Sequence, residues 1–94
     1  MSTRCNLAME INGQWYQTYV HYDGYPSNML PNLNNNFLQS EKAQELVEAG
    51  DLRYVDLDGS YEAYGVKSIK VNEPSRENDY LYVYVPGEGW VVKN

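Results

Sequence analysis

The dipeptide Asn12-Gly13 constrains the fold more than any other feature of this sequence. Residues 3–11, before it, alternate between apolar and polar side chains, which is the pattern of a half-buried β-strand. Residues 14–22, after it, are rich in aromatic and β-branched side chains, which favour strands. Both central residues of a type I′ turn need a positive φ, and asparagine and glycine tolerate one. The sequence therefore predicts an antiparallel hairpin.

A two-residue turn also predicts the register of this hairpin, because pairs can be counted outward from it. The face expected to meet the core contains the pairs Ile11 with Gln14, Met9 with Tyr16, Leu7 with Thr18 and Cys5 with Val20. The opposite face, expected to be open, contains Glu10 with Trp15, Ala8 with Gln17, Asn6 with Tyr19 and Arg4 with His21. We therefore expect Arg4 and His21 to be cross-strand neighbours.

The rest of the chain predicts helices and then more strands. Ser27 and Ser40 are expected to cap two helices, the first shortened by the helix-disfavouring run 34–36 and the second closed by Gly50. Short strands are expected within 51–65 and 66–71, and a second hairpin within 80–94. The predicted fold is one α+β domain over residues 1–94, in which N-terminal and C-terminal hairpins form an antiparallel sheet with one or two short helices on one face.

Charge is concentrated in the middle of the chain. The net charge of the whole chain is −6, and residues 41–62 contain seven acids but only Lys42 and Arg53 as bases. Such a chain repels phosphate backbones, so we expect no direct nucleic-acid binding. Its acids, including Glu45, Glu48, Asp56 and Asp58, are expected either to bind a basic protein surface or simply to keep the protein soluble.

A second candidate site lies at the end of the predicted hairpin. Arg4, Asn6, Tyr19, His21 and Asp23 combine a cation, an amide, a phenol, an imidazole and a carboxylate, which suits a small anion or a nucleotide base. The alternative is structural, since Asp-Gly is an ordinary turn and Tyr-Pro-Ser an ordinary start of a helix.

Two tryptophans suggest an interaction surface. Trp15 is predicted on the open face of the first hairpin, and Trp90 belongs to the C-terminal hairpin. Exposed aromatic side chains often mark protein interfaces, so both are candidates for a partner contact or a homodimer. Cover by another part of the same chain is the alternative.

Catalytic, metal and membrane signals are weak. The lone Cys5 and the lone His21 are predicted on opposite faces of the hairpin, too far apart for a nucleophile and its base. We expect Cys5 to be a buried apolar residue, and no metal or cofactor. An enzyme that uses His21 as base and Asp23 to orient it is the least favoured alternative. With no apolar segment long enough for a membrane and no second cysteine, we expect a cytoplasmic protein.

The stretches STRCN (residues 2–6) and YVHYDGYPSNMLP (residues 19–31) resemble a set of small phage and prophage proteins. These proteins have a Thr-Arg-rich first strand and a His-x-Asp-Gly-Tyr motif before a helix. The positions that match the motif are Arg4, His21, Asp23, Gly24, Tyr25 and Pro26. The resemblance implies an accessory protein acting on a host bacterial protein, and inhibitors of host defence, anti-CRISPR proteins among them, share this size and acidity.

The favoured function is therefore inhibition of a host protein through an acidic and aromatic surface. A nucleic-acid-binding defence complex is the class of partner that we consider first. The alternative is binding of a small anion or nucleotide signal on the Arg4 and His21 face. The residues on which these expectations rest are Arg4, Asn6, Trp15, Tyr19, His21, Asp23, Tyr25, Glu45, Glu48, Asp56 and Asp58.

Overall fold

The computed structural model describes residues 3–93, so Ser2 of the STRCN stretch lies outside the described residues. The N-terminal hairpin consists of strands β1 (Cys5–Ile11) and β2 (Gln14–Val20). Asn12 and Gly13 join them with φ values of 52° and 79°, as a type I′ turn requires. The pairs extend from Ile11 with Gln14 to Cys5 with Val20, which confirms the predicted hairpin and its register over this length.

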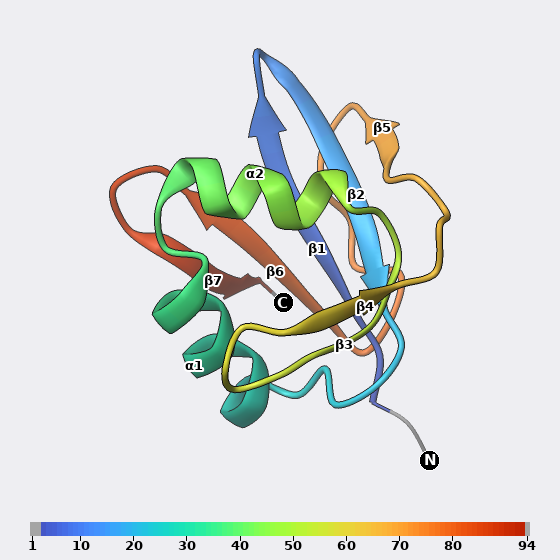
Figure 1. Cartoon of the computed structure of the whole chain (residues 1–94). Coiled ribbons are helices and arrows are strands. Elements are labelled where there is room, and N and C mark those ends of the chain that lie inside the picture. The colour runs from blue at the N-terminus through green and yellow to red at the C-terminus, as the bar shows by residue number, and fades with distance from the viewer. Residues whose placement is uncertain (1–2, 94) are drawn as a thin grey trace.

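Within residues 3–93, seven strands form one sheet, and two helices lie against one of its faces (Figure 1). The order across the sheet is β4-β3-β2-β1-β6-β7, and β5 pairs with β2 outside this path. The α+β class and the C-terminal hairpin of β6 and β7 are confirmed. The later strands are β3 (Leu52–Val55), β4 (Tyr61–Ala63), β5 (Ile69–Val71), β6 (Tyr80–Val85) and β7 (Gly89–Lys93).

The two terminal hairpins meet in parallel, since β6 pairs with the edge of β1 that β2 leaves free. β3 also runs parallel to β2, so the sheet is mixed rather than wholly antiparallel. The start of β6 is fixed by Asp79. Its N–H donates to the Arg4 carbonyl at 3.1 Å, and its carboxylate accepts the Arg4 N–H at 3.1 Å. These two bonds align the beginning of β6 with the beginning of β1.

Helices α1 (Pro26–Asn36) and α2 (Ser40–Glu48) begin earlier than predicted. Tyr25 and Gln39 hold the N-cap positions, neither helix has a side-chain cap, and the expected caps Ser27 and Ser40 lie inside the helices. Pro26 occupies the first position of α1, where a backbone N–H would have no partner within the helix, so its absence costs no hydrogen bond. Gly50 follows the end of α2 with a φ of 91°, the position predicted for it.

The asparagine run does not shorten α1, contrary to the prediction, because two of its amides bind other backbone segments. The Asn34 side chain accepts the Trp90 N–H at 2.8 Å and donates to the Trp90 carbonyl at 3.1 Å. Asn36 donates to the Leu57 carbonyl at 3.0 Å. These contacts dock α1 on β7 and on the β3–β4 turn, which compensates for the poor helix propensity of asparagine.

The main core lies between the helices and the sheet. Cys5, Leu7, Met9 and Ile11 face it from β1, as the alternation predicts. The α2 side chains predicted to face inward, Ala43, Leu46 and Val47, are fully buried in it. The other members are Val20, Met29, Leu33, Phe37, Leu52, Val55, Tyr82, Tyr84 and Trp90. No helix of the described residues is long and apolar enough to span a bilayer.

The opposite face of the sheet, predicted to be open, is partly covered by the polar loop 72–79. The Gln17 side chain accepts the Ser75 N–H at 3.0 Å and donates to the Ser75 carbonyl at 2.9 Å. The Asn6 side chain accepts the Glu77 N–H at 3.1 Å. Asn6 and Gln17 are consequently buried. Asn6 is thus buried and holds this loop, rather than lying on an open face as expected.

Trp90 is also part of the structure's interior rather than an exposed interface residue. Its side chain is 2% exposed, and its indole N–H donates to the Phe37 carbonyl at 3.0 Å. Of the two tryptophans, only Trp15 remains partly exposed. Internal cover, the alternative considered for both, is what the fold provides for Trp90.

Candidate functional site

The HYDGYP stretch forms the corner between β2 and α1, and packing explains its glycine. Gly24 is buried, and a Cβ atom there would lie 2.9 Å from the Cys5 Cβ and 3.0 Å from the Cys5 nitrogen. Its N–H donates to the Thr3 carbonyl at 2.8 Å, and its carbonyl accepts the Tyr82 hydroxyl at 2.6 Å. No larger residue fits this position, so Gly24 has a structural reason to be there.

The residues on either side of Gly24 complete the corner. Asp23 has a φ of 56°, which aspartate tolerates better than most residues, and its carbonyl accepts the Asn28 amide at 2.8 Å. Tyr25 is the N-cap residue of α1, and its carbonyl accepts the Met29 N–H at 2.9 Å. The side chains of Asp23 and Tyr25 are exposed, so the corner leaves both free to contact a partner.

The predicted pairing of Arg4 with His21 is not formed, because the β1–β2 ladder ends one pair earlier, at Cys5 and Val20. The His21 N–H donates to the Leu52 carbonyl of β3 at 3.0 Å instead. The Arg4 backbone turns toward Asp79 at the start of β6. β2 and β1 thus acquire different neighbours at this end of the hairpin.

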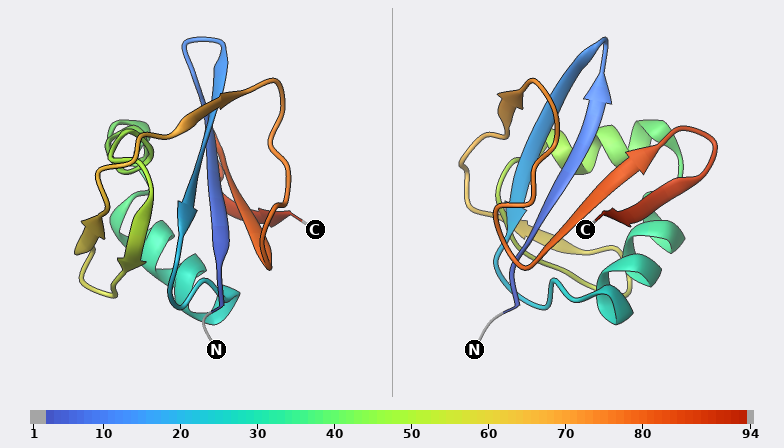
Figure 2. Two further views of the ribbon diagram at one scale, coloured as in Figure 1. Left: turned by 90° about the vertical axis from the view of Figure 1, so that its right-hand side faces the viewer. Right: turned by 180° about the vertical axis from the view of Figure 1, so that it is seen from behind.

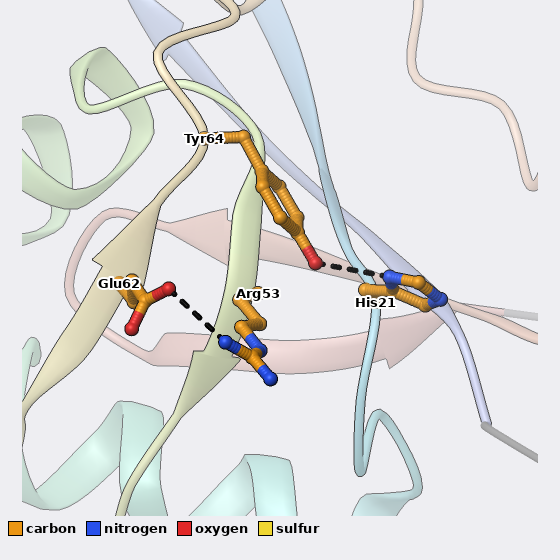
Figure 3. A network of polar contacts seen from close by, with 4 residues as sticks. All are labelled: His21, Arg53, Glu62 and Tyr64. Carbon is orange, nitrogen blue, oxygen red and sulfur yellow. Dashed lines mark hydrogen bonds and ion pairs between the residues drawn. The ribbon is translucent and has the colours of Figure 1, made fainter.

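His21 lies in a cluster of aromatic side chains, which we call the aromatic corner and define as Tyr19, His21, Tyr22, Arg53 and Tyr64. The rings of His21 and Tyr22 stack at 4.2 Å between centroids, and the Tyr64 hydroxyl forms a hydrogen bond with His21 Nδ1 at 3.0 Å (Figure 3). The Arg53 guanidinium lies 5.8 Å from the Tyr22 ring centre, within cation–π range. The cluster presents flat rings and a cation at the surface.

Charges and burial shape the polar groups of this corner. Arg53 forms an ion pair with Glu62 at 3.4 Å, and this hydrogen bond raises the pKa of the guanidinium (Figure 3). Burial raises the pKa of the Tyr19 hydroxyl, while the nearby positive charge of Arg4 lowers it. The net effect is a raised pKa, so this hydroxyl keeps its proton to a higher pH than a free tyrosine does.

The acids of the middle of the chain form an exposed surface. Figure 2 shows α2, β3 and β4 on the same side of the β1–β2 hairpin. We define the acidic face by its six exposed carboxylates, which come from α2, the β3–β4 turn and β4: Glu41, Glu45, Glu48, Asp56, Asp58 and Glu62. Two cations lie among them, Lys42 at 3.9 Å from Glu45 and Arg53 at 3.4 Å from Glu62. The other four carboxylates form no ion pair with a described residue.

The turn between β3 and β4 holds two of these acids in place. Asp58 accepts hydrogen bonds from the hydroxyl and the backbone N–H of Ser60, at 2.6 and 3.0 Å. These bonds lower the pKa of the Asp58 carboxyl, the hydroxyl bond contributing most. Asp56 accepts the Leu57 N–H at 2.9 Å. Asp51, the seventh acid of the window, accepts the Thr18 hydroxyl at 3.0 Å and is not part of the face.

Two shallow hollows show which of these groups lie together. One, of about 390 Å³, is lined by Tyr22, Asp23, Arg53 and Asp56 among others, so it joins the aromatic corner to the acidic face. The other, of about 480 Å³, places Glu45 and Glu48 beside Tyr61 of β4. The predicted sites are therefore neighbours rather than separate regions.

Trp15 and Cys5 lie elsewhere. Trp15 packs against Ala8, Leu81 and Val83 on the face of the sheet away from the helices. Cys5 is fully buried on the helix side, and burial raises the pKa of its thiol, as expected for an apolar residue. Among residues 3–93, no three histidine, cysteine or acidic side chains gather closely enough to hold a metal ion.

Sequence reasoning missed Tyr22, Arg53 and Tyr64, although they complete the surroundings of His21. Tyr64 lies 43 residues after His21, and no local pattern links the two. The contact arises because the β3–β4 hairpin joins β2 in parallel, with the Tyr22 N–H donating to the Arg53 carbonyl at 2.9 Å. Only knowledge of the parallel pairing of β2 with β3 could have indicated that these three residues surround His21.

No protein-family model, curated protein or solved structure matches this chain.

Proposed function

We propose that this protein is a non-enzymatic accessory protein that binds a basic surface of a partner protein and blocks it. The observation that carries the proposal is the acidic face, where six exposed carboxylates surround only two cations. Opposite charge speeds association and selects the partner. Surfaces that bind nucleic acid are basic because they neutralise phosphates, so they are the partner class that this face fits best.

The aromatic corner supports the same proposal. Tyrosine and arginine are enriched at the energetic centres of protein interfaces, where they contribute large contact areas. Tyr22 and Tyr64 are exposed, and Tyr22 shares a hollow with Asp56 of the acidic face. A partner that covers both regions would contact aromatic side chains at one end and carboxylates at the other.

The resemblance of residues 2–6 and 19–31 to phage and prophage proteins supports a bacterial host protein as the partner. On that basis we propose action in the host cytoplasm, as an inhibitor of a nucleic-acid-binding defence complex in the manner of an anti-CRISPR protein. The acidic face would then occupy the position of the phosphate backbone on the complex.

The test is capture of host proteins from a bacterial lysate with the tagged chain and with the double variant Glu45→Lys/Glu48→Lys. Both residues are exposed on α2, lysine is as good a helix former as glutamate, and cations near a helix C-terminus are stabilising. The variant should therefore fold. We expect it to lose the partner and to leave the partner's nucleic-acid binding uninhibited.

A matched control carries the same change of charge elsewhere. Glu73→Lys/Glu88→Lys reverses two exposed acids outside the acidic face and should retain the partner. Equal capture by the two double variants would show that net charge alone, or another surface, determines binding. Capture of the same partner by Glu45→Lys/Glu48→Lys at wild-type affinity would refute the acidic-face proposal.

A second candidate function is binding of a small anion or nucleotide at the aromatic corner. It is favoured by the stacked His21 and Tyr22 rings beside the Arg53 guanidinium, since a base can stack on such rings and arginine can bind a phosphate. A panel of nucleotides should then raise the melting temperature of the wild type but not of His21→Ala. Unchanged melting temperatures across the panel would exclude this candidate.

A further inference from the structure

The face of the sheet away from the helices contains an apolar groove beside loop 72–79. Leu81 and Val83 of β6 line it together with Trp15 of β2, and Pro74 and Pro86 are also among its lining residues. Its volume is about 620 Å³, within the range of pockets that bind small molecules. We call this the Trp15 groove, and it is separate from the aromatic corner and the acidic face.

The sequence of β6 explains why this groove is apolar. Tyr82 and Tyr84 face the helices, whereas Leu81 and Val83 face the groove, so the strand has apolar side chains on both sides. Strands of that kind are typical of sheets covered on both faces. Here loop 72–79 covers only part of the second face. The right-hand view of Figure 2 shows this loop at the left of the sheet and β7 at the right.

Charged residues divide the groove into a cationic end and an acidic end. Lys93 pairs with Leu81 in the sheet, and Arg76 Nη1 lies 3.3 Å from the Asp79 carbonyl, just before β6 begins. Both cations are therefore at the Leu81 end. Neither forms an ion pair with a described residue.

Glu10 lies at the other end of the groove. Ala8 pairs with Val83, so the parallel register continued by two residues places Glu10 beside Val85. With a rise of about 3.3 Å per residue, the two ends are roughly 13 Å apart. A ligand with one negative charge and a linear apolar body matches this arrangement in both length and polarity.

We propose that the Trp15 groove binds an amphipathic monocarboxylate of the medium-chain fatty acid class. Its carboxylate lies between Arg76 and Lys93, and its alkyl chain runs along Leu81 and Val83 toward Trp15. Glu10 repels a second negative charge at the far end, so dicarboxylates of the same length bind more weakly. A second copy of this chain fits the groove less well, because two concave surfaces facing each other leave unfilled space.

The experiment titrates the ¹⁵N-labelled full chain with decanoate below its micelle concentration and follows amide and indole resonances. We expect saturable shifts at the Trp15 indole, Leu81 and Val83, and none at the Trp90 indole, which is buried on the other side of the sheet. Decylamine, which reverses the headgroup charge, and decanedioate, which adds a second carboxylate, are the matched probes. Both should bind at least fivefold more weakly than decanoate.

Two double variants test the role of the cations. Arg76→Ala/Lys93→Ala should weaken decanoate binding at least fivefold, whereas Lys42→Ala/Lys70→Ala, which removes two cations outside the groove, should leave it unchanged. Absence of saturable shifts would overturn the proposal, and so would equal affinity for decylamine. Resonances at Trp15 and Leu81 that move with protein concentration alone would overturn it in favour of a second copy as the occupant.

Discussion

The sharpest test of this fold concerns the amide that joins α1 to the edge of the sheet. Asn34 forms two hydrogen bonds with the backbone of Trp90, at 2.8 Å to its N–H and 3.1 Å to its carbonyl. In this way the side chain imitates a neighbouring strand and protects part of the outer edge of β7. The substitution Asn34→Ala removes both bonds and leaves the two backbone groups without their protein partner.

The expected loss follows from two opposing terms. Each hydrogen bond contributes a net free energy of about 0.5–1.5 kcal/mol, so the pair contributes about 2 kcal/mol. Alanine is a better helix former than asparagine by up to about 0.7 kcal/mol, which offsets part of this loss. Asn34→Ala should therefore lower the free energy of unfolding by about 1–2 kcal/mol.

Asn35→Ala is the control. Asn35 is exposed on the same helix, and its replacement by alanine changes the helix propensity by the same amount as Asn34→Ala does. It should be neutral or stabilising by up to about 0.7 kcal/mol. The difference between the two variants isolates the amide contact at about 2 kcal/mol, or roughly 8–16 °C in melting temperature for a domain of this size. Urea unfolding followed by tryptophan fluorescence measures it. A difference below about 0.5 kcal/mol would refute the reasoning.

Two further predictions concern the corner and the buried ionisable groups. Gly24→Ala should lower the free energy of unfolding by about 1–3 kcal/mol, because the alanine Cβ would press on backbone atoms of Arg4 and Cys5 that cannot move aside. Urea unfolding measures this loss, and a loss below about 0.5 kcal/mol would contradict the prediction. Burial raises the pKa of the Cys5 thiol and the Tyr82 hydroxyl, so the folded state keeps these protons longer than the unfolded chain. The free energy of unfolding should therefore fall as the pH rises above about 9, and it should fall less steeply in Tyr82→Phe. Urea unfolding at a series of pH values from about 7 to 10.5 measures this dependence. The same dependence on pH in the wild type and in Tyr82→Phe would show that Tyr82 does not contribute to the fall.

The fold was predictable wherever a local pattern determined it. Asn12-Gly13 needs positive φ at two adjacent positions, which fixes the turn and the register, and the alternation of residues 3–11 identifies the core face of β1. The parallel pairing of β1 with β6 was not predictable, because it depends on contacts between residues more than 70 positions apart, such as Arg4 with Asp79. Long-range pairing of this kind leaves no periodic trace in either segment.

The asparagine and glutamine side chains illustrate the same limit. Helix propensity alone predicts that the run 34–36 shortens α1, yet α1 includes the whole run, which hydrogen bonds to Trp90 and Leu57 hold in place. Asn6 looked like a ligand-binding amide because it lies on a face expected to be open, whereas it binds loop 72–79. A side-chain amide donates and accepts at once, so it can serve a backbone segment as well as a ligand. Sequence alone does not distinguish the two uses.

The corner HYDGYP combines backbone groups that shape the fold with the exposed side chains of Asp23 and Tyr25. Gly24 is required by its contact with β1 and by the Tyr82 hydrogen bond, and the backbone of Asp23 and Tyr25 starts α1. None of these roles uses the exposed side chains of Asp23 and Tyr25. Substitutions of these two exposed side chains should therefore cost little stability. Substitutions of Asp23 and Tyr25 that leave stability intact while weakening partner binding would locate function at the corner, whereas Gly24 reports only on packing.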